Sequence, residues 1–368
     1  DTILYSVLPF VGMLVALIVV HELGHYFTAK IFGIKVLEAG LGYPPRAWGF
    51  TWRETIYSVN WIPLGGFVRL LGEEDPTDPQ SLAAQKAWKR IIVLAAGSGM
   101  NIITPIVLFA VAFMLPRDVP VGPAVIESVE RGGPAAEAGL LPQDRVVSIE
   151  GSEVKNTLDV GRLVRLNMGE DVEFEVQRPI AGGGFETVTA NVDSRWDSRA
   201  PTGITISNLV SGSQICQTSD LDQCKQTEQY AFLGAIGKGW TSTIDALVLA
   251  RNQVISMVKG GEGPDVAGPV GIADATGDVV EEAGWKTLLD FAALLSINLA
   301  IINILPLPML DGGRIVFVLI EMARRGRRIA PEKEAIVHLV GLAAMLTLAV
   351  VITYFDVLRL IDGRSLFD

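Results

Sequence analysis

Cysteine and histidine are both scarce in this sequence of 368 residues, which contains 2 cysteines and 3 histidines. Two cysteines are too few for a thiolate metal cage or an iron–sulfur cluster. Cys216 and Cys224 are close in the sequence, and the sequence leaves open whether they form a disulfide or remain thiols. Charged residues make up only 19% of the chain and hydrophobic residues 49%, which excludes an ordinary soluble enzyme and indicates an integral membrane protein.

The net charge of -11 is unevenly distributed along the chain. Basic residues gather in two groups that follow apolar segments, and acidic residues concentrate in the middle. The basic groups are Lys30, Lys35, Arg46, Arg53, Arg69, Lys86, Lys89 and Arg90, and Arg324, Arg325, Arg327, Arg328 and Lys333. Basic groups beside membrane spans typically mark the cytoplasmic side. We therefore expect contact with a lipid bilayer and no nucleic-acid partner.

Four apolar segments are each long enough to cross the hydrocarbon core of a bilayer, which takes about 20 helical residues. They lie in residues 1–32, 91–115, 288–322 and 335–357. The first has no basic leader and no small-residue cleavage site, so we expect a span rather than a signal peptide. The sequence therefore predicts a membrane α-helical bundle of four transmembrane helices.

The first span contains the pattern His-Glu-Leu-Gly-His at residues 21–25. On a helix, His21 and His25 lie one turn apart on the same face, so two imidazoles can bind one metal ion. Glu22 lies beside them as a candidate general base. So short a pattern also arises by chance, but ionisable groups at membrane depth are costly and generally functional. We predict a Zn2+ site with His21 and His25 as ligands and Glu22 as the catalytic residue.

A third ligand is required because two histidines leave a zinc ion half coordinated. The third span is broken at residues 303–313 by two prolines, which are followed by Asp311 and a pair of glycines. Irregular backbone at membrane depth is tolerated where it lines a cavity. We therefore predict Asp311 as the third ligand; the alternative is that it caps the following helix. His338, the remaining histidine, is expected to have a structural or interfacial role.

The segments between the spans differ in composition. Residues 33–90 contain short β-type runs separated by proline and glycine turns, which predict a membrane-associated β-hairpin or small sheet on the cytoplasmic side. Such a sheet fits an edge strand for an extended substrate, and its tryptophans fit an interfacial anchor. Residues 207–287 are expected to form a polar linker and an amphipathic helix that lies on the membrane surface.

Residues 121–206 are charged and turn-rich, with short runs of alternating polarity. The run GPAAEAGL at residues 133–140 resembles a bacterial PDZ domain. An inserted PDZ-like α+β domain would bind a peptide as an added strand or limit access by size. In this permuted arrangement, we expect its peptide-binding loop at Thr202, Gly203 and Ile204.

Four features occur together along the chain: the HELGH span, the NILPLPMLDG segment at residues 303–312, the IPLGGFV turn at residues 62–68, and the PDZ-like insertion. Together they resemble the site-2 protease family, specifically the bacterial RseP-type zinc metalloproteases of regulated intramembrane proteolysis. The resemblance covers nearly the whole chain. It departs from RseP in having one PDZ-like domain rather than two, which affects substrate gating rather than the chemistry.

The resemblance implies a multi-pass protein of the bacterial inner membrane, with the PDZ-like domain extracytoplasmic and the active site toward the cytoplasmic side. It implies hydrolysis of peptide bonds in the transmembrane segments of single-span proteins, such as anti-sigma factors or signal-peptide remnants. Substrate binding is then expected at Gly65, Gly66 and Phe67 by strand addition and at Asn303 through the substrate backbone.

Two other functions fit the same features. A receptor or scaffold would bind peptide tails through the PDZ-like domain without catalysis, but the intact Glu22 and Asp311 argue against it. A metal transporter would use the same ligands as a transit site, and its metal flux would not depend on Glu22.

Overall fold

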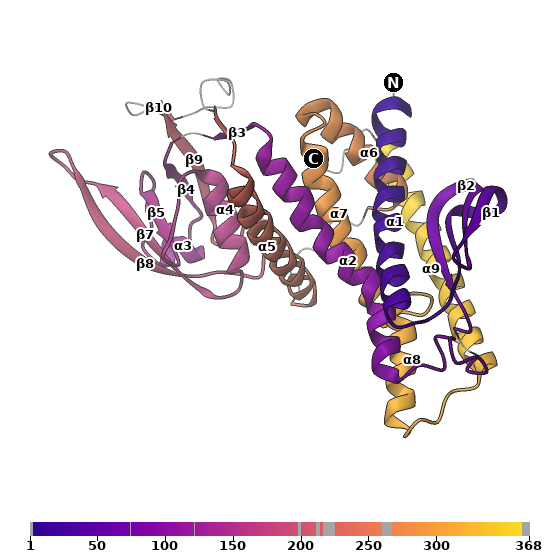
Figure 1. Ribbon diagram of the computed structural model, residues 1–368. Coiled ribbons are helices and arrows are strands. Elements are labelled where there is room, and N and C mark those ends of the chain that lie inside the picture. The colour runs from indigo at the N-terminus through magenta and orange to yellow at the C-terminus, as the bar shows by residue number, and fades with distance from the viewer. Residues whose placement is uncertain are drawn as a thin grey trace. The chain divides into compact units, whose positions relative to one another are not determined.

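The structure is a computed structural model that describes residues 3–73, 75–120, 122–197, 200–210, 214–215, 225–259 and 267–362 (Figure 1). Cys216 and Cys224, whose pairing the sequence leaves open, lie outside the described residues. The chain forms two compact units. The first is drawn from Asp1–Ala112, Ile236–Thr243 and Val266–Asp368, and the second from Phe113–Ala235 and Ile244–Asp265.

The first unit is mainly helical. Its elements are the π-helical turn η1 (Ile3–Val7), α1 (Leu8–Ile31), α2 (Ala87–Met114, whose last residues belong to the second unit), α6 (Pro269–Asp278), the π-helical turn η3 (Val279–Ala283), α7 (Thr287–Ile304), α8 (Asp311–Ala323) and α9 (Pro331–Ile361). Four helices in the described chain are long and apolar enough to span a membrane: Tyr5–Ile31, Ala87–Met114, Thr287–Ile304 and Pro331–Ile361. The expectation of four candidate membrane-spanning helices is therefore confirmed.

Helix α9 shows why these segments need a lipid environment. Pro331 is the first residue of the helix, and its ring fixes φ near the helical value. The two glutamates in the first turn interact favourably with the positive end of the helix dipole. Beyond that turn its apolar side chains point outward; Leu339 is 65% exposed and Val350 is 69% exposed. A contiguous apolar surface of this kind is stable against hydrocarbon and unfavourable in water.

A twisted antiparallel sheet follows α1. It consists of β1 (Val36–Trp52) and β2 (Thr55–Leu70), which are longer than the short runs expected from the sequence because the strands continue through their glycine and proline positions. Each long strand bends back on itself, so its two halves pair separately. Residues 36–41 pair with residues 56–59 on one side and with residues 66–70 on the other. The backbone order is thus 46–52, 55–60, 36–41 and 66–70, which places 66–70 last.

The second unit is an α+β fold. Its sheet has the order β10-β9-β4-β5-β7-β8, with β6 also paired to β5. The strands are β4 (Ala124–Val129), β5 (Arg145–Ile149), β6 (Ser152–Glu153), β7 (Asp171–Pro179), β8 (Phe185–Asp193), β9 (Ile204–Val210) and β10 (Gln214–Ile215), and the helices are α3 (Pro134–Glu137) and α4 (Thr157–Leu166). A separate two-stranded ladder joins β3 (Arg117–Pro120) to β11 (Lys225–Glu228).

The core of the second unit follows from the period of two along its strands. Val172, Phe174 and Val176 alternate on β7 and are fully buried. Burial of each such side chain contributes about 1.5–3 kcal/mol relative to exposure. One charge is also buried there: Asp144 accepts hydrogen bonds from Arg178 Nε at 2.9 Å and Nη2 at 2.7 Å. These hydrogen bonds and the charge of Asp144 raise the pKa of Arg178, against the effect of burial.

Helix α5 (Phe232–Val258) contributes residues to both units. It carries large apolar side chains that are exposed, such as Leu233 at 81% and Val258 at 83%, whereas the polar residues Asn252 and Ser256 are fully buried. Asn252 donates to the last carbonyls of α4 and Ser256 to the carbonyl of Trp196. The helix thus has exposed apolar side chains and turns polar groups inward at these two positions; its place on the membrane surface stays a prediction.

Candidate active site

The two histidines of the HELGH pattern lie on the buried face of α1. His21 is 8% exposed and His25 is 9% exposed, and their ring centroids are 4.9 Å apart. They share this face because four residues span about one helical turn. Gly24 between them lies against α2; a Cβ at Gly24 would be 2.3 Å from the carbonyl oxygen of Ala96. The absence of a side chain there lets the second helix approach the histidine pair.

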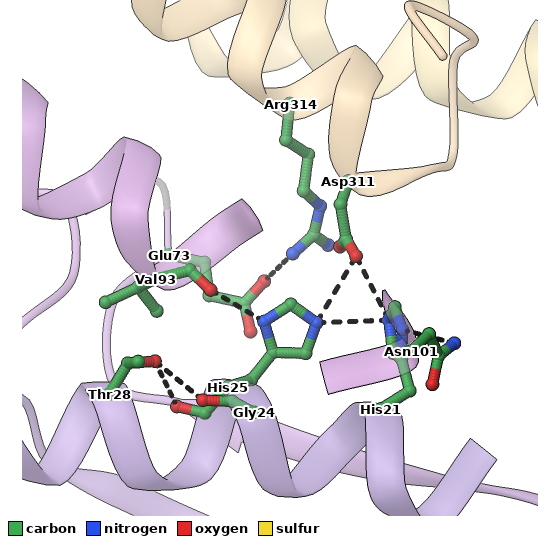
Figure 2. A network of polar contacts seen from close by, with 9 residues as sticks. All are labelled: His21, Gly24, His25, Thr28, Glu73, Val93, Asn101, Asp311 and Arg314. Atoms are coloured by element: carbon green, nitrogen blue, oxygen red, sulfur yellow. Dashed lines mark hydrogen bonds and ion pairs between the residues drawn. The ribbon is translucent and has the colours of Figure 1, made fainter. Parts of the chain in front are cut away.

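Asp311 joins the histidines from the far end of the sequence. It is the first residue of α8, and its Oδ2 lies 3.1 Å from His21 Nε2 and 3.3 Å from His25 Nε2 (Figure 2). The residue at the N-cap position of α8 is Leu310, so the alternative in which Asp311 caps that helix is wrong. The side chain of Asp311 points at the two imidazoles instead.

These three ligand atoms fit a zinc ion. Four ligand atoms placed about 2.0–2.1 Å from a tetrahedral ion lie about 3.3 Å from one another. The two contacts of Asp311 are 3.1 and 3.3 Å, and the two Nε2 atoms are 3.2 Å apart. Two imidazoles and a carboxylate are ordinary zinc ligands, and three protein ligands leave one position for water or substrate, as in catalytic sites.

The groups around the histidines orient them. His25 Nδ1 lies 2.8 Å from the carbonyl oxygen of Val93 on α2, which accepts a hydrogen bond and leaves Nε2 directed at Asp311. Asn101, also on α2, lies 3.3 Å from His21 Nδ1 through its amide. Residues of α2 thus contact the Nδ1 atoms of both histidines, and the two Nε2 atoms converge.

Glu22 lines the same cavity as the three converging residues. This cavity measures about 620 Å³ and is bounded by α1, the sheet and the segment from α7 to α8. Gly66 lies beside Glu22, since a Cβ on Gly66 would be 3.7 Å from Glu22 Cγ. A carboxylate next to a metal-binding cluster, in the same cavity, has the placement of a general base.

Comparison with known proteins shows the family. The sequence profile of peptidase family M50 matches residues 9–348, which is most of the chain. The chain belongs to peptidase family M50.

Relatives of this M50 protein are similar over nearly their full length. A candidate zinc metalloprotease of Clostridium perfringens is 34% identical over 93% of this chain and 96% of its own. The zinc metalloprotease RasP of Geobacillus kaustophilus is 28% identical over 96% of this chain and 98% of its own. The regulator of sigma-W protease RasP of Bacillus subtilis is 28% identical over 96% of this chain and 99% of its own.

The M50 protein is therefore an intramembrane zinc metalloprotease of the site-2 type, with zinc as its cofactor. The expectation of this family, activity and metal is confirmed, and the receptor and transporter alternatives are not favoured.

The residues expected to bind substrate fall into two groups. Gly66, Phe67 and Asn303 line the cavity of the M50 site. Gly65 precedes Gly66 with a φ of +81°, a left-handed conformation that favours glycine, and a Cβ there would be 3.5 Å from Ile18 Cδ1 of α1.

The residues Thr202, Gly203 and Ile204 belong to the second unit, where they lead into and begin β9. Thr202 is buried, and its carbonyl accepts from Ala135 N. The carbonyl of Gly203 accepts from Glu130 N in the same way. Their backbone is thus tied to the residues around α3.

A set of charged residues around the cavity was not predicted from the sequence. Glu38 accepts from Arg46 at 2.7 Å, from Arg69 at 3.2 Å and from Ser58 at 2.8 Å. Burial alone would raise the pKa of Glu38, but these hydrogen bonds and the two arginine charges together lower it. The sequence carries no periodic signal for this cluster because its members come from different segments of a folded ribbon.

An ion pair at the cavity was also not predicted from the sequence: Arg314 Nη1 lies 2.6 Å from Glu73 Oε2 (Figure 2). Both residues line the cavity, and they are 241 positions apart in the sequence. Pairing across such a separation follows from tertiary structure alone.

The loop that presents Asp311 is supported by α9. Met309 has a φ of +76°, uncommon for a residue with a side chain, and its N–H donates to His338 Nδ1 at 2.8 Å. Gly341 lies against Pro308; a Cβ there would be 2.2 Å from Pro308 Cβ. His338 thus contacts the loop and is outside the cluster of three ligand atoms.

Proposed function

We propose that His21, His25 and Asp311 hold the catalytic zinc ion and that Glu22 is the general base. The observation that carries this assignment is the convergence of three ligand atoms within 4.8 Å of one another beside Glu22. Zinc bound there acts as a Lewis acid that polarises a peptide carbonyl and makes water more acidic.

Glu22 then takes a proton from the attacking water molecule while the oxygen of that water forms a bond to the carbonyl carbon of the peptide. The C–N bond breaks when Glu22 delivers that proton to the leaving amine. A substrate helix hides its scissile peptide group in hydrogen bonds, so it must unwind first.

We propose that the outer strand segment at residues 66–70 receives the unwound substrate. Addition of an extended chain to a strand replaces the hydrogen bonds lost on unwinding. Gly66 and Phe67 lie on this segment and line the cavity, while Asn303 lines it from the end of α7 and offers an amide to the substrate backbone. The substrate class is single-span membrane proteins such as anti-sigma factors; the name of the Bacillus subtilis relative as a regulator of sigma-W protease supports it.

We also propose that residues 121–206 form a PDZ-like domain on the extracytoplasmic side of the bacterial inner membrane, with the active site toward the cytoplasm. The basic groups near the first and third spans support this orientation under the positive-inside rule. Thr202, Gly203 and Ile204 would belong to its peptide-binding loop, and the domain would act as a sieve for substrates already trimmed outside the membrane. If deletion of residues 121–206 leaves the cleavage of full-length and trimmed substrates unchanged, the sieve is wrong.

Zinc stoichiometry tests the ligand assignment. Purified wild type should hold about one zinc ion per chain, and His21→Ala, His25→Ala and Asp311→Ala should each lose most of it, because a catalytic site has few ligands to spare. His338→Ala, which removes the histidine outside the cluster, is the matched control and should retain most of its zinc, because it loses only a hydrogen bond to the loop that presents Asp311. Retention of zinc by all three ligand variants would contradict the assignment.

A further inference from the structure

Asn101 is a fully buried polar residue in the middle of α2 whose function the mechanism above does not use. Its amide nitrogen Nδ2 lies 3.3 Å from His21 Nδ1. Its Oδ1 is buried and has no hydrogen-bond partner among the described residues. A buried amide oxygen without a partner costs about 1–3 kcal/mol, so the position needs an explanation.

The chemistry of the histidine supplies one. His21 Nε2 faces Asp311 and His25, so it is the atom directed at the zinc position. A neutral imidazole that binds a metal through Nε2 carries its proton on Nδ1 and donates it. The amide nitrogen Nδ2 is also a hydrogen-bond donor. If it faced the Nδ1–H of His21, two donors would point at each other and no hydrogen bond could form.

A half-turn of the Asn101 amide about its Cβ–Cγ bond exchanges the two atoms and removes the conflict between the two donors at His21 Nδ1. Oδ1 then accepts from His21 Nδ1–H, and the amide nitrogen takes the buried place that the oxygen leaves. The backbone is suited to hold the amide in place, because the carbonyl of Asn101 accepts from Ser296 Oγ on α7 at 2.9 Å. Ser296 is itself fully buried.

We infer that Asn101 is a positioning residue that accepts a hydrogen bond from His21 Nδ1–H and thereby fixes the tautomer and orientation in which His21 binds zinc. It has the same function for His21 that the carbonyl of Val93 has for His25. The inference rests on the proposed assignment of His21 as a zinc ligand. Loss of such a partner typically lowers metal affinity 10–100-fold.

The test measures zinc affinity of the purified full chain by competition with a chromophoric chelator. Asn101→Leu has similar volume and no acceptor, and it should bind zinc about 10–100-fold more weakly than wild type. Asn101→Asp restores an acceptor in the same place and should bind within a few-fold of wild type. Ser296→Ala removes the contact to the Asn101 backbone but leaves the amide, and it should also bind within a few-fold.

The outcomes separate this inference from the proposed function. Wild-type affinity in Asn101→Leu, or equal losses in Asn101→Leu and Asn101→Asp, would overturn the positioning role and leave the zinc ligands intact. If His21→Ala also binds zinc as tightly as wild type, the ligand assignment itself fails. The visible spectrum of the cobalt-substituted protein adds a readout of ligand geometry, which should change in Asn101→Leu and not in Ser296→Ala.

Discussion

Gly97 is the position where the smallest change should have the largest effect on the zinc site. It lies on α2 against the Nε2 atoms that face the zinc position, and a Cβ there would be 2.5 Å from His21 Nε2 and 2.5 Å from His25 Nε2. Gly97→Ala adds that one carbon. Neither histidine ring can rotate freely away, because Val93 and Asn101 hold their other nitrogens.

The size of the effect follows from these distances. Non-bonded heavy atoms are most stable about 3.5–4.0 Å apart, so the rings or the helix must move by about 1 Å. Metal–ligand distances in good sites vary by only about 0.2 Å, and a misplacement of about 1 Å costs on the order of 100-fold in rate. We predict that Gly97→Ala lowers zinc affinity and peptide cleavage by about 100-fold or more.

Gly99→Ala is the matched control on the same helix. A Cβ at Gly99 would meet nothing within 4 Å. Both substitutions raise helix propensity by about 1 kcal/mol, so a difference between them reports the contact with the histidines rather than the helix. Zinc affinity and cleavage of a single-span substrate are measured for both variants at equal amounts of folded protein. Equal zinc affinity in Gly97→Ala and Gly99→Ala would refute the geometry of the site.

Three further predictions concern the groups that support the site and the second unit. Because the pKa of Glu38 is lowered in the folded state, the ionised carboxylate contributes its full stability above the ordinary pKa of 4.5. That stability is lost as the pH falls through the lower pKa of the folded state. Proteolysis of the β1–β2 sheet should therefore increase at acid pH in wild type and show a smaller pH dependence in Glu38→Gln. Arg178→Met leaves the buried Asp144 without its partner and should destabilise the second unit by about 3–5 kcal/mol, seen as faster hydrogen exchange in β5 and β7, whereas unchanged exchange would contradict the pairing. His338→Ala removes the acceptor of Met309 N–H, which contributes about 1 kcal/mol, and should lower zinc affinity roughly fivefold in the chelator assay; an unaltered affinity would show that the loop holds its shape without α9.

The chemistry of the site was easier to predict from the sequence than its surroundings. His21, Glu22 and His25 lie within one helical turn, so the sequence spacing alone puts the histidines on one face. Asp311 is 290 positions from His21. It was predicted because zinc needs a third ligand and because a doubly broken span at membrane depth must line a cavity.

The sheet and the charged groups of the cavity were harder to predict. Residues 33–90 indicated strands, but their turn residues suggested breaks where β1 and β2 continue. Strand pairing depends on register and cross-strand contacts that no local pattern encodes. The pair of Glu73 and Arg314 depends on tertiary structure in the same way. The PDZ-like interpretation of residues 121–206 and the substrate-binding residues stay predictions.

The function of Glu22 as general base is tested most directly by comparing wild type with Glu22→Gln on a single-span model substrate in detergent, with zinc occupancy matched between the two proteins. Glutamine keeps the size of the side chain and removes the base. We predict that Glu22→Gln retains zinc and loses cleavage almost completely, because the proton transfer depends on Glu22. Cleavage by Glu22→Gln at the wild-type rate would contradict it.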